Sequence, residues 1–297
     1  AAGAPGPPDA PSPETLLLAP GAAELGEPTR TLSRQNRTIE QIEPEDLLTA
    51  ELPRPDVFSF HFYPGGSERC GGKMLGHSAE KALLPAWLDS IDPAIARMTA
   101  LRDRAAPGAP LWDTETGEAA CGGNPWASAF ADSFRFVDTL GRSARQGVRV
   151  VMHNTLAASD YALLEEHGYD PRPNYWAALL WKRTMGTTVL APLDWASGDL
   201  RIYAHCLPTG KGGVGLALLN LGDSARTIPI RGEARIWTIT ASSLESRSVS
   251  INGRQPALGD DGDFTGLEAA PLTADSSLPG KAIAFIAVAK AGNRNCR

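Results

Sequence analysis

The chain has 297 residues and a net charge of −6, with 42% hydrophobic and 21% charged residues. This composition is typical of a globular protein and argues against a largely disordered one. The 28 Lys and Arg residues are scattered, which argues against general nucleic-acid binding because phosphate contacts need a basic surface. No apolar stretch approaches the ~18 to 20 residues that cross a bilayer, so we expect no membrane span.

The first 14 residues are rich in Pro, Ala and Gly, which predicts a linker or a surface loop. They lack the basic and hydrophobic parts of a signal peptide. Four short apolar runs follow: TLLLAP (15–20), DVFSFHFYP (56–64), APLWDTE (109–115) and GVRVVMHN (147–154). Apolar residues at three- and four-residue spacing predict helices over 83–105, 125–146 and 174–186. Strands that alternate with helices predict a parallel sheet.

The pattern changes after Gly186, where short apolar runs are separated by Gly, Asn, Asp and Pro. The predicted strands are LRIYAHC (200–206), GVGLALLNL (213–221), ARTIPI (225–230), ARIWTIT (234–240), RSVSING (247–253) and AIAFIAVA (282–289). They predict an all-β module, a β-sandwich. Four β/α units are half of an eightfold barrel, and a whole barrel of about 250 residues with a sandwich of about 100 does not fit easily into this length. Either the sheet is open or the chain lacks the beginning of a barrel.

The four cysteines are widely spaced and form no CxxC pair, so we expect no zinc site. Cys70 and Cys121 lie in glycine-rich loops, whereas Cys206 ends a predicted strand and Cys296 is the penultimate residue. Pairing loop with loop and strand with tail gives Cys70–Cys121 and Cys206–Cys296. Buried free thiols are the alternative. Two disulfides would imply an oxidising compartment.

Polar side chains stand where the predicted parallel strands end. His61 and Tyr63 close the second run, Glu115 closes the third and Asn154 closes the fourth. Each has a structural explanation by itself, but together they fit a site, because catalytic groups of parallel barrels lie at the carboxyl ends of the strands. Glu118 lies past the strand end, where we expect a solvated loop carboxylate, so position favours Glu115.

Several longer stretches resemble glycoside hydrolase family 79, the heparanase and β-glucuronidase family. They are LWDTETGEAACGG (111–123), LGRSAR (140–145), DPRPNYWAALLWKR (170–183) and LRIYAHC (200–206) with a Cys near the C-terminus. The resemblance implies a (β/α)8 TIM barrel with a C-terminal β-sandwich. It also implies a retaining mechanism with two glutamates that cleaves β-linked glucuronic acid without a metal or organic cofactor. Residues 1–190 would then be the C-terminal half of the barrel, strands five to eight, and residues 191–297 the sandwich.

The resemblance also implies roles for individual residues. Glu115 matches the nucleophile at the end of the seventh strand. His61 and Tyr63 match polar residues at the end of the sixth, where the tyrosine contacts the nucleophile. Cys206 and Cys296 match the disulfide of the family's sandwich.

Substrate-binding residues follow from the same resemblance. The backbone of Cys121 and Gly122 matches the loop whose amides receive the uronate carboxylate. Tyr161 matches a tyrosine that helps to bind it, although one residue fewer separates it from Asn154. Asn154 itself replaces a glutamine, which leaves its sugar contact open.

One element of the family is missing. Members carry the acid/base glutamate in an Asn-Glu-Pro motif at the end of the fourth strand, and this chain has no such motif. The stretch TLLLAPGAAELGEPTR (15–30) resembles the family's fifth strand and its loop, which places Glu27, in the sequence GEP, in that loop; Glu27 as the acid is the less favoured alternative. We therefore expect the first four β/α units, with the acid, to lie outside these 297 residues as a separate segment or chain.

The resemblance implies a heparanase-like endo-β-glucuronidase acting on heparan sulfate or a related glycan, and two disulfides would fit a secreted, periplasmic or extracellular location. An exo-β-glucuronidase of the same family is an alternative, because loops that block one end of the cleft would decide between the two. The sequence is also compatible with a non-catalytic glycan-binding relative and with an interaction module built on the β-domain. The retained Glu115 weighs against the glycan-binding relative, whereas the missing acid/base glutamate weighs for it. The polar rim weighs against the interaction module.

Overall fold

The computed structural model describes most of the chain from residue 15 to the C-terminus. The described ranges are 15–25, 31–34, 37–40, 42–48, 53–67, 78–191, 198–209, 211–230, 232–259, 262–273 and 275–297, with residues 193 and 196. The predicted linker at 1–14, Glu27 and Cys70 lie outside these ranges. Crossing a bilayer would take a longer or more apolar helix than any in this described part.

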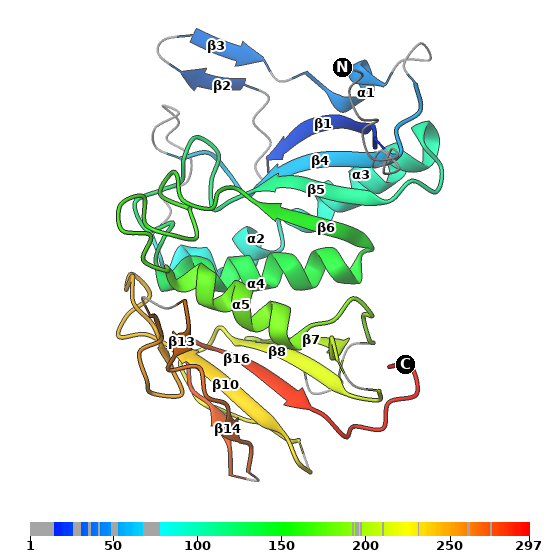
Figure 1. The fold of residues 1–297 in the computed structure, drawn as a ribbon. Helices are drawn as coiled ribbons and strands as arrows, with labels where there is room; N and C mark the ends of the chain where they lie inside the picture. The colour runs from blue at the N-terminus through cyan, green and yellow to red at the C-terminus, as the bar shows by residue number, and fades with distance from the viewer. Residues whose placement is uncertain are drawn as a thin grey trace, which may run out of the picture.

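Four parallel strands form one sheet, as the alternation of apolar runs and helical segments predicts. In spatial order they are β1 (Leu18–Leu25), β4 (Val57–Tyr63), β5 (Leu111–Thr116) and β6 (Val148–His153). They lie side by side at the top of Figure 1. β1 and β6 are therefore the edge strands of this sheet.

The first strand differs from its prediction. It begins at Leu18 and continues through Pro20 and Gly21, where composition indicates a turn. Pro20 is tolerated because, among the described strands, β1 pairs with β4 alone, and the register shifts between Pro20 and Ala22. A hairpin of β2 (Thr31–Arg34) and β3 (Arg37–Glu40) and the short α1 (Pro44–Leu47) follow, and the sequence pattern predicted none of them.

The predicted helices are present, with changes at their starts. The segment 83–105 is divided into a 3-10 turn, η2 (Lys81–Leu83), the short α2 (Pro85–Leu88) and α3 (Ile91–Ala105). α4 (Phe130–Arg145) begins five residues later than predicted, and its first two N–H groups donate to the carbonyls of Ser246 and Leu244. α5 (Pro173–Thr184) agrees closely with its prediction. α4 is thus tied at its start to the C-terminal part of the chain.

The C-terminal part is an antiparallel sheet. Its spatial order is β11 (Ser250–Ile251), β10 (Arg235–Thr240), β16 (Ala282–Val288), β8 (Val214–Asn220) and β7 (Leu200–Cys206), and β14 (Ala270–Pro271) also pairs with β10. The C-terminal part also contains two separate two-stranded ribbons: β9 (Arg226–Thr227) pairs with β15 (Ser277–Leu278), and β12 (Ala257–Leu258) pairs with β13 (Phe264–Thr265). The predicted strand 225–230 is therefore reduced to two residues.

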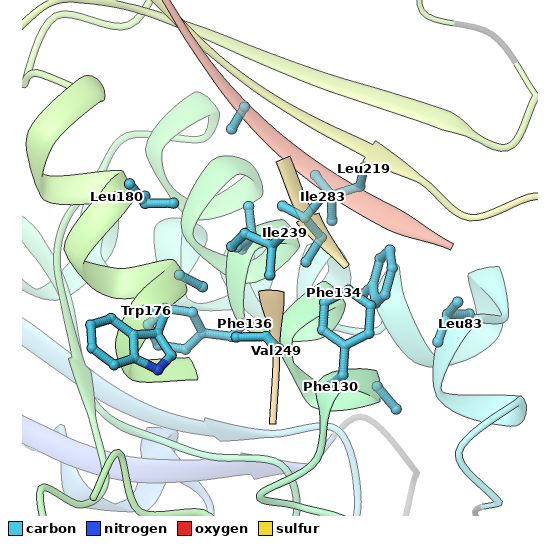
Figure 2. Close-up of a cluster of buried hydrophobic side chains, with 14 of the residues drawn as sticks. Leu83, Phe130, Phe134, Phe136, Trp176, Leu180, Leu219, Ile239, Val249 and Ile283 are labelled. Carbon is cyan, nitrogen blue, oxygen red and sulfur yellow. The ribbon is translucent and has the colours of Figure 1, made fainter. Parts of the chain in front are cut away.

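Both faces of this antiparallel sheet are buried. Alternate residues such as Leu219 and Ile283 face α4 and α5, where Phe134 and Trp176 meet them in one apolar cluster (Figure 2). The intervening residues of the sheet pack against side chains that include Ile228 of the segment around β9. Figure 1 shows the two helices between the parallel and the antiparallel sheets. The expected β-sandwich stays a prediction.

Charged groups join α4 to the antiparallel sheet. Asp138 is completely buried and accepts hydrogen bonds from Arg201 of β7, at 2.5 Å, and from the Tyr203 hydroxyl, also at 2.5 Å. A Cβ atom at Gly141 would lie only 2.3 Å from Cγ of Tyr203. Glycine is therefore required in LGRSAR, because only a residue without a Cβ lets the Tyr203 ring lie against α4.

The disulfide predicted between Cys206 and Cys296 is present, with a Cα–Cα distance of 5.2 Å. Cys121 is also disulfide-bonded. Because Cys70 lies outside the described residues, the pairing of Cys70 with Cys121 stays a prediction. The Cys206–Cys296 bond ties the C-terminal tail to the end of β7.

Replacing Cys206 and Cys296 together by serine is expected to lower the free energy of unfolding by about 2 to 5 kcal/mol, because the bond closes a long loop that the unfolded chain would otherwise leave open. Urea unfolding of the complete protein and of the double variant measures the difference. An unchanged midpoint, or alkylation of both thiols in the unreduced wild type, would contradict the assignment.

Candidate active site

The carboxyl ends of β4, β5 and β6 meet at one edge of the parallel sheet. His61 of β4 lies opposite Glu115 of β5, and Thr116 lies opposite His153 of β6. Asn154 follows directly after β6, and its N–H donates to the Thr116 carbonyl at 2.8 Å. The structure therefore brings His61, Glu115 and Asn154 together at the carboxyl edge of the sheet, as the sequence pattern predicts.

A β-bulge sets the direction of Glu115. Phe60 pairs with Asp113 but His61 pairs with Glu115, so Thr114 is an extra residue in the ladder. Thr114 donates from its hydroxyl to the Phe60 carbonyl at 3.2 Å. Regular alternation would put Glu115 on the same face as Asp113, which is fully buried. The bulge instead places Glu115 opposite His61.

Glu115 has a hydrogen-bond donor fixed beside it. The Tyr63 hydroxyl donates to Oε1 at 2.6 Å, and Nδ1 of His61 lies 3.7 Å from Oε2. Burial first, and then the hydrogen bond to Glu115, raise the pKa of Tyr63, so the phenol keeps its proton. The Glu115 side chain is 40% exposed. A carboxylate that is oriented yet open to solvent can reach a ligand.

Asn154 and Tyr161 extend this arrangement. Asn154 donates from Nδ2 to the Tyr63 hydroxyl at 3.0 Å and to the Tyr161 hydroxyl at 3.2 Å. The two tyrosine rings are 6.3 Å apart between centroids. Gly117 makes room for them, because a Cβ there would lie 3.1 Å from Cε1 of Tyr63 and 3.2 Å from Cδ1 of Tyr161. Asn154 therefore links both rings to the carboxylate.

The loop 121–123 lies against Tyr161. Cys121, Gly122 and Gly123 have φ angles of 69, 92 and 86°, so three successive residues are left-handed. A Cβ at Gly123 would lie 2.9 Å from Cβ of Ala127 and 3.0 Å from Cδ1 of Tyr161. Gly122 accepts from the Asp160 N–H at 3.2 Å, while its own N–H donates to no residue of the described chain. The two glycines are needed for this backbone path.

The expectation of a solvated Glu118 is wrong. Its side chain is fully buried and accepts from the backbone N–H and from Nδ2 of Asn124, both at 2.8 Å. Burial, and then the negative charge of Asp132, raise its pKa to about 7. The only signal in the sequence is that its neighbours Gly117, Ala119 and Ala120 are small and uncharged.

The sequence pattern also did not predict a buried polar cluster behind β5. Asp132 and Arg135 of α4 form an ion pair at 2.5 Å, although both are almost fully buried, and Asn174 of α5 donates to Asp132 at 2.6 Å. Charged residues of an amphipathic helix are expected to face solvent, so the sequence pattern predicts that Asp132 and Arg135 are exposed. Only the structure reveals that they lie inward.

His153 belongs to the same region. Its Nε2 donates to the Tyr161 carbonyl at 2.7 Å, and its Nδ1 is buried. Burial, followed by the positive charge of Arg135, lowers its pKa from 6.5 to about 4. The unfolded chain therefore binds a proton at higher pH than the folded protein does, so this residue's contribution to stability is lost as the pH falls from 6.5 towards 4.

Between pH 7 and pH 5 the wild type should lose about 2 kcal/mol more unfolding free energy than His153→Gln, since the amide does not titrate but can still donate to the Tyr161 carbonyl. Urea unfolding of both proteins at the two pH values measures this. Equal losses would show that another group carries the acid sensitivity.

No family model matches the chain. It is 35% identical over 203 residues to heparanase-like protein 1 of Arabidopsis thaliana, covering 68% of this chain and 36% of that protein. It is 33% identical over 224 residues to heparanase of Gallus gallus, covering 68% and 42%. It is 29% identical over 237 residues to inactive heparanase-2 of Mus musculus, covering 71% and 40%. The chain thus spans about two fifths of the length of these relatives.

Among solved structures, a 4-O-α-L-rhamnosyl-β-D-glucuronidase from Fusarium oxysporum is similar with a TM-score of 0.59 at 16% identity, covering 78% of this chain and 53% of that one. An α-L-arabinofuranosidase from Thermotoga petrophila is similar with a TM-score of 0.56 at 14% identity, covering 79% and 53%. At these identities the likeness concerns the fold alone, and the fold is one that glycosidases share.

Proposed function

Because the chain belongs to the heparanase and β-glucuronidase family, glycoside hydrolase family 79, we propose that it carries the nucleophile of a retaining glycosidase that cleaves β-linked glucuronic acid. The observation that carries this proposal is the Glu115 carboxylate. It stands at the end of β5, is partly exposed, and accepts a 2.6 Å hydrogen bond from Tyr63.

In this mechanism Glu115 attacks the anomeric carbon and forms a glycosyl-enzyme ester, while a second carboxyl group protonates the leaving oxygen. The second group then takes a proton from the water that hydrolyses the ester. The Tyr63 hydroxyl holds the Glu115 carboxylate in one orientation through its 2.6 Å hydrogen bond. Asn154 in turn orients the hydroxyl by donating to it at 3.0 Å.

The second carboxyl group is proposed to lie outside these 297 residues, in the N-terminal half of a TIM barrel. The parallel strands would be strands five to eight, within residues 1–190, and residues 191–297 would form the sandwich. Both edge strands leave room for partners: Leu17 beside β1 is 41% exposed, and Met152 on β6 is also 41% exposed. Unpaired edges and exposed apolar side chains are what a missing half would cover.

The proposed substrate is a glycan that contains β-linked glucuronic acid, heparan sulfate or a related polymer. The Tyr161 hydroxyl is linked to Glu115 through hydrogen bonds, and together with the Gly122 N–H it would receive the sugar carboxylate. Exo-cleavage of a terminal glucuronide is the alternative. The Cys206–Cys296 disulfide favours a secreted, periplasmic or extracellular location, because such bonds persist in oxidising compartments.

A non-catalytic glycan-binding protein is the second candidate. The similarity to inactive heparanase-2 favours it. The hydrogen bond from Tyr63 to Glu115 favours the enzyme instead, because a protein that only binds glycans does not need an oriented carboxylate at this position.

Glu115→Gln in the complete gene product is expected to reduce the turnover of an aryl β-glucuronide by at least about 10⁴-fold while the thermal midpoint stays within a few degrees, because the amide keeps its size but cannot attack. Glu166→Gln is the control, since Glu166 is exposed. Turnover retained by Glu115→Gln would exclude Glu115 as the nucleophile. The 297-residue chain by itself should be inactive.

The complete protein should hydrolyse an aryl β-glucuronide at least about tenfold more efficiently than the matching aryl β-glucoside, because charge-assisted hydrogen bonds to a carboxylate are stronger than those to a hydroxyl. Comparison of kcat/KM for the two substrates measures this preference. Equal values would contradict the proposed uronate-binding loop.

A further inference from the structure

We propose that Glu118 is a positioning residue whose buried carboxylate holds the loop 121–123 in the shape that receives the carboxylate of the sugar. Glu118 would thereby set the preference for a uronic acid without touching the substrate. This inference rests on the proposed function, because it assigns a purpose to the loop only if the loop binds a uronate.

The contacts of Glu118 close the loop on itself. One oxygen of its carboxylate accepts from the backbone N–H of Asn124 and the other from Nδ2 of the same residue, both at 2.8 Å. Residues 118 and 124 are the two ends of the segment that contains the left-handed residues. The carboxylate therefore acts as a clamp between the ends, and burial makes both hydrogen bonds stronger than they would be in water.

The loop needs such a clamp because its backbone is unfavourable. Cys121 adopts a φ angle of 69°, which disfavours any residue with a Cβ, and two glycines that have large freedom in the unfolded chain follow it. Within the loop the Gly123 N–H donates to the Ala119 carbonyl at 3.2 Å. Outside it the Ser67 hydroxyl donates to the Cys121 carbonyl at 3.1 Å. The disulfide bond of Cys121 also restrains this residue, but it leaves the backbone at Gly122 and Gly123 free to rotate. Without the clamp the Gly122 N–H would sample more orientations.

The clamp and the nucleophile are held by different partners. Glu115 accepts its hydrogen bond from Tyr63 of β4, whereas the bonds of Glu118 come from Asn124. Loss of the clamp should therefore weaken the binding of a carboxylate-bearing substrate and leave the chemical step largely unchanged. That separation between KM and kcat distinguishes positioning of the loop from a general loss of structure.

The surroundings of Glu118 also make the clamp sensitive to pH. Asp132 and Arg135 of α4 are the charged groups that face it. Arg135 also attracts Asp113 of β5 and repels a proton on His153 of β6. Burial and Asp132 together raise the pKa of Glu118 to about 7. Asn124 offers two donors, which an ionised carboxylate accepts and a protonated one does not, so the clamp loosens as the pH falls below this value.

The test measures kcat and KM of the complete gene product with an aryl β-glucuronide and an aryl β-glucoside. Glu118→Gln is expected to raise KM for the glucuronide about tenfold, with kcat within about twofold and KM for the glucoside unchanged. KM of the wild type for the glucuronide should rise as the pH falls from 8 to 6, and Glu118→Gln should remove this dependence. Glu166→Gln is the exposed control.

Unchanged KM for the glucuronide in Glu118→Gln, or an equal loss with both sugars, would overturn the inference. If that variant does not fold, Asn124→Ala removes one of the two hydrogen bonds, and it should raise KM for the glucuronide by a smaller factor. The inference would also be overturned if Asn124→Ala did not raise KM for the glucuronide and the KM of the wild type did not depend on pH.

Failure of the proposed function gives a different result. A wild type that hydrolyses no glucuronide would contradict the enzyme proposal. Calorimetric binding of glucuronate would then test Glu118 separately: affinity that falls in Glu118→Gln supports the clamp, and absent or unchanged affinity overturns it.

Discussion

The hydrogen bond from Tyr63 to Glu115 depends on the extra residue in β5. The bulge at Thr114 turns Glu115 to the face that His61 occupies on β4, and without it the carboxylate would follow Asp113 to the buried face. Parallel pairing of the two strands then brings the Tyr63 hydroxyl within 2.6 Å. One local irregularity therefore decides whether this edge of the sheet can hold a nucleophile.

Helix α4 packs behind the part of the parallel sheet that carries this edge. α4 lies between the two sheets (Figure 1), and its buried charged groups interact with residues on both sides. Arg135 faces β5 and the loop that follows it, whereas Asp138 binds Arg201 and Tyr203 of the antiparallel sheet. These polar contacts on two sides of α4 favour one rotation of the helix about its axis.

Much of this arrangement follows from sequence patterns. The apolar runs predict the four parallel strands, and their polar ends predict that His61, Glu115 and Asn154 meet, since carboxyl ends of parallel strands share an edge. The bulge at Thr114 leaves no trace in the pattern, because residues 113–116 are all polar and show no alternation that an extra residue could interrupt. The burial of Glu118 was missed for a different reason: it depends on the loop conformation that turns Asn124 back onto the carboxylate and on Arg135 of α4, and neither can be read from the spacing of residues along the chain.

The central claim is that Glu115 forms a covalent bond with the sugar. A 2-deoxy-2-fluoro β-glucuronide with a good leaving group should trap the glycosyl-enzyme, because the fluorine slows hydrolysis of the ester more than its formation. Digestion of the inactivated complete protein and mass spectrometry of the peptides then locates the label. The account predicts one label, on Glu115. A label on Glu118 or on another residue, or release of the leaving group without any label, would contradict it.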